Sequence, residues 1–261
     1  MTDTPIRAAA TTLIVREGAG LEVLMVERAR EIDFFSGAMM FPGGKVEAQD
    51  LDPRWETQAL GWRDVAPDER APRLAAIREA FEECGLLAAA GRVDLAADEI
   101  AAARAGVESG ALSFLDFVVS RDVRPDLSRL TLFSRWLTPS FAPKRFDTFF
   151  YLVAAPEEQR AIQDGREIAA TEWVAPGEAL RRAAAGERVI LFPTRLNLRQ
   201  LAETATLAEA VDRAELRPRR QVTPAIETHD GERYLRLSPE DGYGEVFEPL
   251  ERDRPRRAPS A

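Results

Sequence analysis

The sequence predicts an α/β protein in which a mixed β-sheet is flanked by helices. Three observations carry this prediction: short alternating apolar runs typical of strands, longer amphipathic segments typical of helices, and the succession of both kinds along the chain. The chain has 261 residues, 45% of them hydrophobic, which is enough to bury a substantial core. We therefore expect one main domain with an appendage rather than two domains of equal size.

Strands are predicted where β-forming residues gather between Gly and Pro residues. Residues 17–20 read as a hairpin-like connection between the first two strands. Asp230-Gly231 is a strong hairpin-turn signal and divides residues 222–237 into two strands. The other predicted strands are residues 8–15, 21–27, 130–137, 148–154 and 167–174, and a loop is expected over 34–40.

The most informative helix is predicted over roughly residues 72–84. Pro72 is suited to the first turn of a helix, and Gly85 can supply the left-handed residue that ends it. A second proline-to-glycine pattern predicts a helix from Pro176 that stops at Gly186. The other helices are predicted over residues 93–105, 111–121, 194–203 and 207–216.

Three carboxylates fall on one side of the helix that ends at Gly85. Glu79 is three and four positions before Glu82 and Glu83, so the three side chains are neighbours whose like charges destabilise a helix. A bound divalent cation would reverse that cost, and hard cations prefer oxygen ligands. Upstream, Gly43-Gly44 predicts a tight turn where the backbone can approach a ligand or a metal.

These residues resemble the sequence box of the Nudix hydrolases, G-x5-E-x7-R-E-U-x-E-E-x-G-U, where U is aliphatic. Gly44 and residues 78–86 match it, whereas Asp50 stands where the box has its first glutamate. Residues 51–77 occupy the place of the seven box residues and contain an insert read as an excursion between loop and helix. The Nudix coenzyme A diphosphatases tolerate an insert here, and further matching stretches are Arg28 with Gly37, Trp136–Pro139 and Arg145–Phe150.

The resemblance implies a Nudix-type α/β/α sandwich with a C-terminal helical and hairpin extension. We expect a Nudix domain over residues 1–205, with the insert 51–77 inside its box. Residues 206–251 are predicted to be a packing or dimerisation arm, so a homodimer is possible. Residues 252–261 lack an apolar period and are predicted to be a disordered tail.

The resemblance also implies metal-dependent hydrolysis of the diphosphate bond of coenzyme A or acyl-coenzyme A. The products would be 3′,5′-ADP and 4′-phosphopantetheine or its acyl form. Mg²⁺ or Mn²⁺ would be held by Glu79, Glu82, Glu83 and the carbonyl of Gly43. Glu79 is also expected to orient or deprotonate the attacking water, and Arg78 to orient the glutamates.

Several assignments around this site stay open in the sequence. Glu167 and Glu172 are weaker candidates for the general base. Phe34, Phe35, Met39 and Met40 are read first as core residues and second as an apolar wall for an acyl or pantetheine arm. The expected substrate-binding residues are Arg28, Gly44, Lys45, Lys144 and Arg145, the last two being read equally well as a solvated surface pair.

Two other functions remain in view. The first is a Nudix hydrolase acting on another nucleoside diphosphate derivative, such as ADP-ribose or NADH. The second is a noncatalytic Nudix-like ligand-binding module, which is prompted by Asp50 and by the interrupted box.

Composition excludes several classes of protein. A net charge of −9 and a pI near 5.0 argue against a nucleic-acid-binding protein. With Cys84 as the single cysteine and His229 as the single histidine, an intrachain disulfide and a multi-histidine zinc site are excluded. No apolar run is long enough to span a membrane, and residues 259–261 are not a peroxisomal signal. We therefore expect a cytoplasmic protein.

Overall fold

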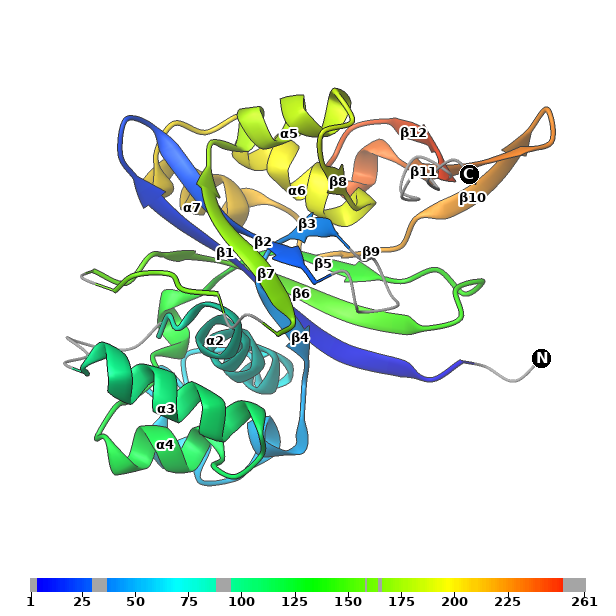
Figure 1. Cartoon of the computed structure of the whole chain (residues 1–261). Coiled ribbons are helices and arrows are strands. Elements are labelled where there is room, and N and C mark those ends of the chain that lie inside the picture. Colours follow the sequence, from blue (N-terminus) through cyan, green and yellow to red (C-terminus); the bar gives the residue numbers. More distant parts are fainter. Residues whose placement is uncertain (1–3, 30–36, 88–94, 158, 164–165, 251–261) are drawn as a thin grey trace, which may run out of the picture.

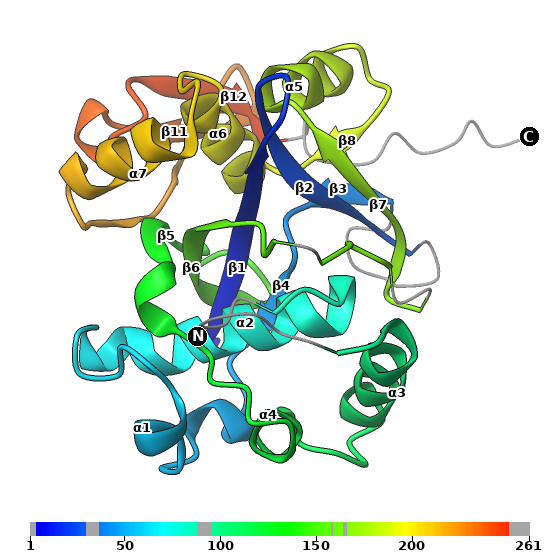
Figure 2. The ribbon, with the colours of Figure 1, turned by 90° about the vertical axis from the view of Figure 1, so that its left-hand side faces the viewer.

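The molecule is a three-layer α/β/α sandwich, as predicted (Figure 1). The computed structural model describes residues 4–29, 37–87, 95–157, 159–163 and 166–250. One group of helices, α2, α3 and α4, covers one face of the central sheet, and α5, α6 and α7 cover the other (Figures 1 and 2). In the described part of the chain no helix is both long and apolar enough to cross a membrane.

The central sheet has nine strands and is mixed. Its longest pairing is parallel, between residues 6–15 of β1 and residues 145–154 of β6. Strand order is β8-β3-β2-β1-β6-β5-β9, with β4 paired to β1 and β7 paired to β2. The strands are β1 (Ile6–Glu17), β2 (Leu21–Arg28), β3 (Ala38–Met40), β4 (Gly43–Lys45), β5 (Thr131–Leu137), β6 (Arg145–Ala154), β7 (Ile168–Val174), β8 (Val189–Ile190) and β9 (Gln221–Val222).

The helix with the three carboxylates is confirmed and is ended as predicted by Gly85, whose φ is +71°. A second helix, α3, begins at Ala97, where Glu99 accepts a hydrogen bond from the Ala96 N–H and so caps the first turn; the predicted start at residue 93 lies outside the described residues. The helices are α1 (Trp55–Gln58), α2 (Arg70–Cys84), α3 (Ala97–Glu108), α4 (Phe114–Ser120), α5 (Pro176–Ala184), α6 (Phe192–Leu201) and α7 (Leu207–Leu216), with short 3₁₀ turns at 48–51, 67–69, 127–129 and 239–241.

Several short strands were not predicted. β3 replaces part of the loop expected over 34–40, and β4 replaces the tight turn expected at Gly43-Gly44. Strands of two or three residues show no alternation in the sequence, because they exist through pairing with distant chain segments. In β4, a Cβ on Gly43 would lie 2.4 Å from the Ala10 carbonyl oxygen of β1, so only glycine allows this pairing.

The insert in the box is a packed part of the protein. α2 begins at Arg70, so the excursion covers residues 51–69 and the last part of the predicted insert is helical. Trp55 is 1% exposed, lies against Phe114 with 6.1 Å between ring centroids, and donates its indole N–H to the Gln49 carbonyl. The insert therefore extends the hydrophobic core on the α2 side of the sheet.

The chain after residue 205 folds back onto its own subunit. α7 packs on β5 and β1, and β9 pairs with β5 at the edge of the central sheet. The predicted hairpin at Asp230-Gly231 is confirmed, with φ values of 52° and 82°. It joins β10 (Ala225–His229) to β11 (Glu232–Leu237). These two strands form a separate three-stranded sheet with β12 (Val246–Pro249).

Buried side chains connect this second sheet to the helices above the central one. Leu235 and Leu237 join the hydrophobic cluster that also holds Trp136 and Phe192. The segment thus packs as an arm within the subunit. The boundary at residue 205 and the homodimer stay predictions, and the tail predicted over 252–261 lies outside the described residues.

Replacing Trp55 tests whether the insert is part of the core. We expect Trp55→Ala to lower the free energy of unfolding by about 3–5 kcal/mol, because a large buried side chain is lost and a cavity remains. Urea denaturation followed by fluorescence and circular dichroism measures this change. Leu51→Ala is the control: Leu51 is 67% exposed, and a change within about 0.5 kcal/mol is expected. A Trp55→Ala protein as stable as the control would mean that the insert is peripheral.

Candidate active site

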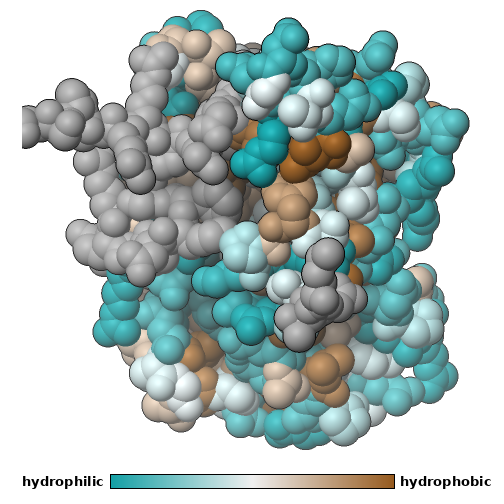
Figure 3. Space-filling model, turned by 90° about the vertical axis from the view of Figure 1, so that its right-hand side faces the viewer, coloured by the Kyte–Doolittle hydropathy of each residue, from teal (hydrophilic) through white to brown (hydrophobic). Residues whose placement is uncertain are grey.

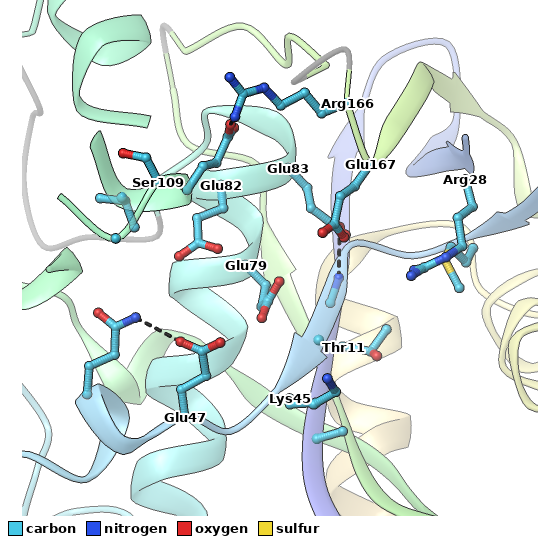
Figure 4. Close-up of a pocket in the computed structure, with 18 of the residues that line it drawn as sticks. Thr11, Arg28, Lys45, Glu47, Glu79, Glu82, Glu83, Ser109, Arg166 and Glu167 are labelled. Carbon is cyan, nitrogen blue, oxygen red and sulfur yellow. Dashed lines mark hydrogen bonds and ion pairs between the residues drawn. The ribbon is translucent and has the colours of Figure 1, made fainter. Parts of the chain in front are cut away.

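A cavity of about 900 Å³ lies where β4 and the carboxylate helix α2 meet (Figure 4). Side chains from β1, β4, α2, the α3–α4 connection and the segment before β7 line it. The structure brings seven of the predicted site residues to its wall: Arg28, Gly43, Gly44, Lys45, Glu79, Glu82 and Glu83.

Arg78 lies behind this wall and is 1% exposed. Its guanidinium donates two hydrogen bonds of 3.0 Å to Asp50, one of 2.8 Å to the Lys45 carbonyl and one of 2.9 Å to Glu79. A bidentate pair of this kind fixes both position and orientation. Arg78 therefore ties β4 and Asp50 to α2 and orients Glu79, and it does not line the cavity.

The two glycines of β4 let the backbone touch the carboxylates. The Gly43 N–H donates a 3.0 Å hydrogen bond to Glu83 Oε2. A Cβ on Gly44 would lie 2.2 Å from Glu79 Oε1, which is closer than non-bonded atoms approach. Close contacts rather than a turn conformation therefore favour glycine here: Gly43 lies against β1, and Gly44 lies against Glu79 of α2.

Burial makes these carboxylates hard to ionise. Desolvation raises the pKa of Glu79 to about 7, although the charge of Arg78 opposes the shift. Burial and the neighbouring charge of Glu79 raise the pKa of Glu83 well above its ordinary value, and burial also raises the pKa of Glu82. Without a cation, the cluster therefore opposes full ionisation.

The donor set suits a hard divalent cation, which prefers carboxylate and carbonyl oxygens. In the structure, however, the described acidic, His and Cys side chains do not already converge on a metal position. Glu79 and Glu82 hydrogen-bond to Arg78, and Glu83 to Gly43. A cation at this site would compete for these oxygens and would relieve the cost of burying three neighbouring charges.

Two acidic residues of the cavity were not among the main site residues predicted from the sequence. Glu167 lines it and faces Glu83 (Figure 4), whose pKa it helps to raise. Glu47 also lines it and adds to the negative charge near Glu82. Glu172, by contrast, pairs with Arg182 at 2.5 Å and lies outside the cavity lining. Only the folding of distant segments brings Glu47 and Glu167 to α2, so no local pattern marks them.

The predicted cations separate into two groups. The Nε of Arg28 is buried and has no hydrogen-bond partner among the described residues, and its guanidinium points into the cavity (Figure 4). Lys45 also lines the cavity. Lys144 instead lines a neighbouring apolar groove, and Arg145 lines neither, since its Nε donates to the Thr138 carbonyl at 3.2 Å.

The apolar wall considered for an acyl arm is only partly present. Met40 lines the cavity, whereas Met39 is buried in the core on the other side of the sheet. Phe34 and Phe35 lie outside the described residues. Of the two described residues of this set, Met40 therefore contributes apolar surface to the cavity and Met39 does not.

Comparison with known proteins identifies the family of this chain. The family model of the NUDT19 Nudix domain matches residues 56–201. The chain is 30% identical to the acyl-coenzyme A diphosphatase NUDT19 of Gallus gallus, with 71% of this chain and 62% of that protein covered. It is 26% identical to the Homo sapiens protein of the same name, with 73% and 63% covered. The chain thus spans less than two thirds of the length of these relatives.

A solved structure supports the same assignment. The crystal structure of a NUDIX hydrolase from Alicyclobacillus acidocaldarius superposes with a TM-score of 0.72 at 30% identity. The match covers 80% of this chain and 96% of that one. The sequence resemblance is thereby confirmed, and the chain belongs to the Nudix family described by the NUDT19 Nudix domain.

Proposed function

We propose that this protein hydrolyses the diphosphate bond of coenzyme A or an acyl-coenzyme A. The products are 3′,5′-ADP and 4′-phosphopantetheine or its acyl form. The observation that carries the proposal is one cavity lined by the carboxylates Glu79, Glu82 and Glu83 together with the cation Arg28. The names of the vertebrate relatives supply the substrate class.

Glu79, Glu82, Glu83 and the Gly43 carbonyl are the proposed ligands of Mg²⁺ or Mn²⁺. When bound, such an ion neutralises charge on the diphosphate oxygens and lowers the pKa of an attacking water. Arg78 keeps Glu79 in position from behind, because it is held by Asp50 and is shielded from solvent.

Two glutamates that line the cavity are the proposed bases for the attacking water. Glu79 is the base expected from the sequence, and its carboxylate lines the cavity within the group of proposed metal ligands. Glu167 faces the same space from the segment before β7. Arg28 is the proposed positive group that donates hydrogen bonds to a substrate phosphate. Its guanidinium points into the cavity, and its buried Nε has no hydrogen-bond partner among the described residues. The cytoplasmic location stays a prediction.

Product analysis tests the reaction and its carboxylates together. We expect purified protein with Mg²⁺ or Mn²⁺ to release 3′,5′-ADP from coenzyme A, and Glu82→Gln or Glu83→Gln to lower kcat/KM by about 100-fold or more, because charge stabilisation at the diphosphate is lost. Glu172→Gln is the matched control, since Glu172 lies outside the cavity.

The substrate panel separates the alternatives. Preferential cleavage of ADP-ribose or NADH would keep the metal site and replace the substrate. Equal cleavage of coenzyme A and 3′-dephospho-coenzyme A would show that the protein does not recognise the 3′-phosphate. No cleavage of any diphosphate with either metal would leave a noncatalytic binding module as the better description.

A methyl group on Gly44 tests the contact between β4 and Glu79. Its Cβ would meet the Glu79 carboxyl group at 2.2–2.4 Å, and this end of a flexible side chain can turn away. We expect Gly44→Ala to displace the carboxylate and to lower kcat by up to about 100-fold, with little change in melting temperature. Gly20→Ala, where a Cβ has no neighbour within 4 Å, should match the parent in both measurements. Full activity of Gly44→Ala would mean that catalysis does not depend on the position of the Glu79 carboxylate.

The raised pKa of Glu83 predicts how stability depends on pH. Its folded-state pKa lies above the ordinary value of 4.5, so the folded state binds the proton more tightly than the unfolded state. Stability is therefore lost as pH rises through 4.5 toward the folded-state pKa. We expect Glu83→Gln to raise the melting temperature of metal-free protein by about 2–4 °C near pH 8, and by less near pH 5.

Differential scanning calorimetry with EDTA and then with Mg²⁺ measures this effect. The parent should gain stability on adding Mg²⁺, and the variant should gain less. An equal difference between variant and parent at both pH values would contradict a raised pKa for Glu83.

A further inference from the structure

A second, apolar groove of about 540 Å³ lies beside the proposed active site. Aromatic and proline side chains make up much of its lining, including Trp136, Phe141, Phe150 and Phe192. It lies between the end of the β5–β6 hairpin, the start of α6 and the C-terminal strands. On the side of the molecule where these hairpins lie, hydrophobic residues reach the surface among hydrophilic ones (Figure 3).

The groove adjoins the carboxylate cavity, and the two share part of their walls. Phe146 and Thr148 line both of them. These residues are two apart on β6, so their side chains lie on the same face of the sheet. A chain that is attached to a diphosphate beside Glu79 can therefore reach the groove by passing Thr148 and Phe146.

The lining suits an uncharged chain rather than a nucleotide. Among its described residues there is no Asp or Glu, and its two cations, Lys144 and Arg233, are exposed at its surface. A nucleoside 3′-phosphate would need buried donors for its base, ribose and phosphate, whereas an alkyl chain needs only apolar surface. Within the carboxylate cavity, Arg28 and Lys45 offer the positive charge that phosphates require.

The arm after residue 205 forms one side of the groove. Pro224, Leu235 and Leu250 line it from this arm, and Leu235 is 7% exposed because it also packs into the core. The segment that was predicted to be a packing or dimerisation arm thus completes a surface that opens toward the active site.

We propose that this groove binds the acyl chain of an acyl-coenzyme A and makes the protein prefer longer acyl esters. The inference rests on the proposed function, because the acyl chain is assigned through the substrate whose diphosphate occupies the carboxylate cavity. The groove then sets specificity by burial of methylene groups, and the C-terminal arm is the element that makes it.

Binding measured without cleavage tests this directly. Isothermal titration calorimetry of the full chain in EDTA compares acetyl-coenzyme A with octanoyl-coenzyme A, so that contributions of the shared head group cancel. We expect Kd for the octanoyl ester to be lower by about tenfold or more, since each buried methylene favours binding. Phe141→Asp, which puts a charge in the groove, should reduce this ratio to about two.

Two further variants make the result specific. Ala142→Trp narrows the groove and should reduce the ratio in the same way. Phe247→Asp is the matched control: Phe247 is 44% exposed, against 49% for Phe141, and it lines neither cavity, so the ratio should be kept. Melting temperatures confirm that each variant is folded.

The outcomes separate the groove from the reaction. Equal Kd values for both esters in the parent protein would overturn the proposal, as would a ratio that Phe141→Asp and Ala142→Trp leave intact. If Phe141→Asp weakens both esters equally, the groove holds the nucleotide instead and the proposal also fails. A chain-length effect without cleavage of either ester after Mg²⁺ is added would support the groove and reject the diphosphatase.

Discussion

The buried ion pair between Arg78 and Asp50 is the interaction on which the site depends. Both side chains are 1% exposed, and the guanidinium also binds the Lys45 carbonyl and Glu79. One residue thereby holds the start of the insert, strand β4 and helix α2 in a single arrangement. Removing either partner would leave an uncompensated buried charge, which is far more costly than the pair itself. Asp50, which stands where the box has its first glutamate, thus holds the arginine although its side chain is one methylene shorter.

The carboxylates of α2 lie close to this ion pair, and their burial lowers the stability of the folded protein when they are ionised. Glu83 is 5% exposed and accepts one hydrogen bond from the Gly43 N–H, while Glu79 and Glu167 add negative charge nearby. Such an arrangement stays unfavourable in the folded chain until a cation or a protonation offsets it. The apolar side of the same helix packs well, since Phe81 contacts Phe114 and Phe117 in the hydrophobic core.

The insert in the box and the C-terminal arm both contribute side chains to the hydrophobic core. The insert contributes Trp55 to the core below the sheet, and the C-terminal arm contributes Leu235 and Leu237 to the core above it. Arg195 of α6 forms an ion pair with Glu248 of the arm, and both side chains are largely buried. The arm reaches the β5–β6 hairpin as well, so it contributes to the groove that adjoins the carboxylate cavity.

The sequence alone was sufficient for the α/β/α class, for helix α2 with its glycine end, and for the three carboxylates, because periodicity, capping and helical spacing act within a few residues. The sequence did not predict that Gly43–Lys45 form strand β4, or that Glu167 and Glu47 line the cavity. Nor did it predict that Arg145 lines neither the cavity nor the groove. Those features depend on which distant segments pair and pack. Glu167 is far from Glu83 along the chain and becomes its neighbour only because β7 pairs with β2. Local patterns determine elements and chemistry, whereas only tertiary packing decides which charges share one buried space.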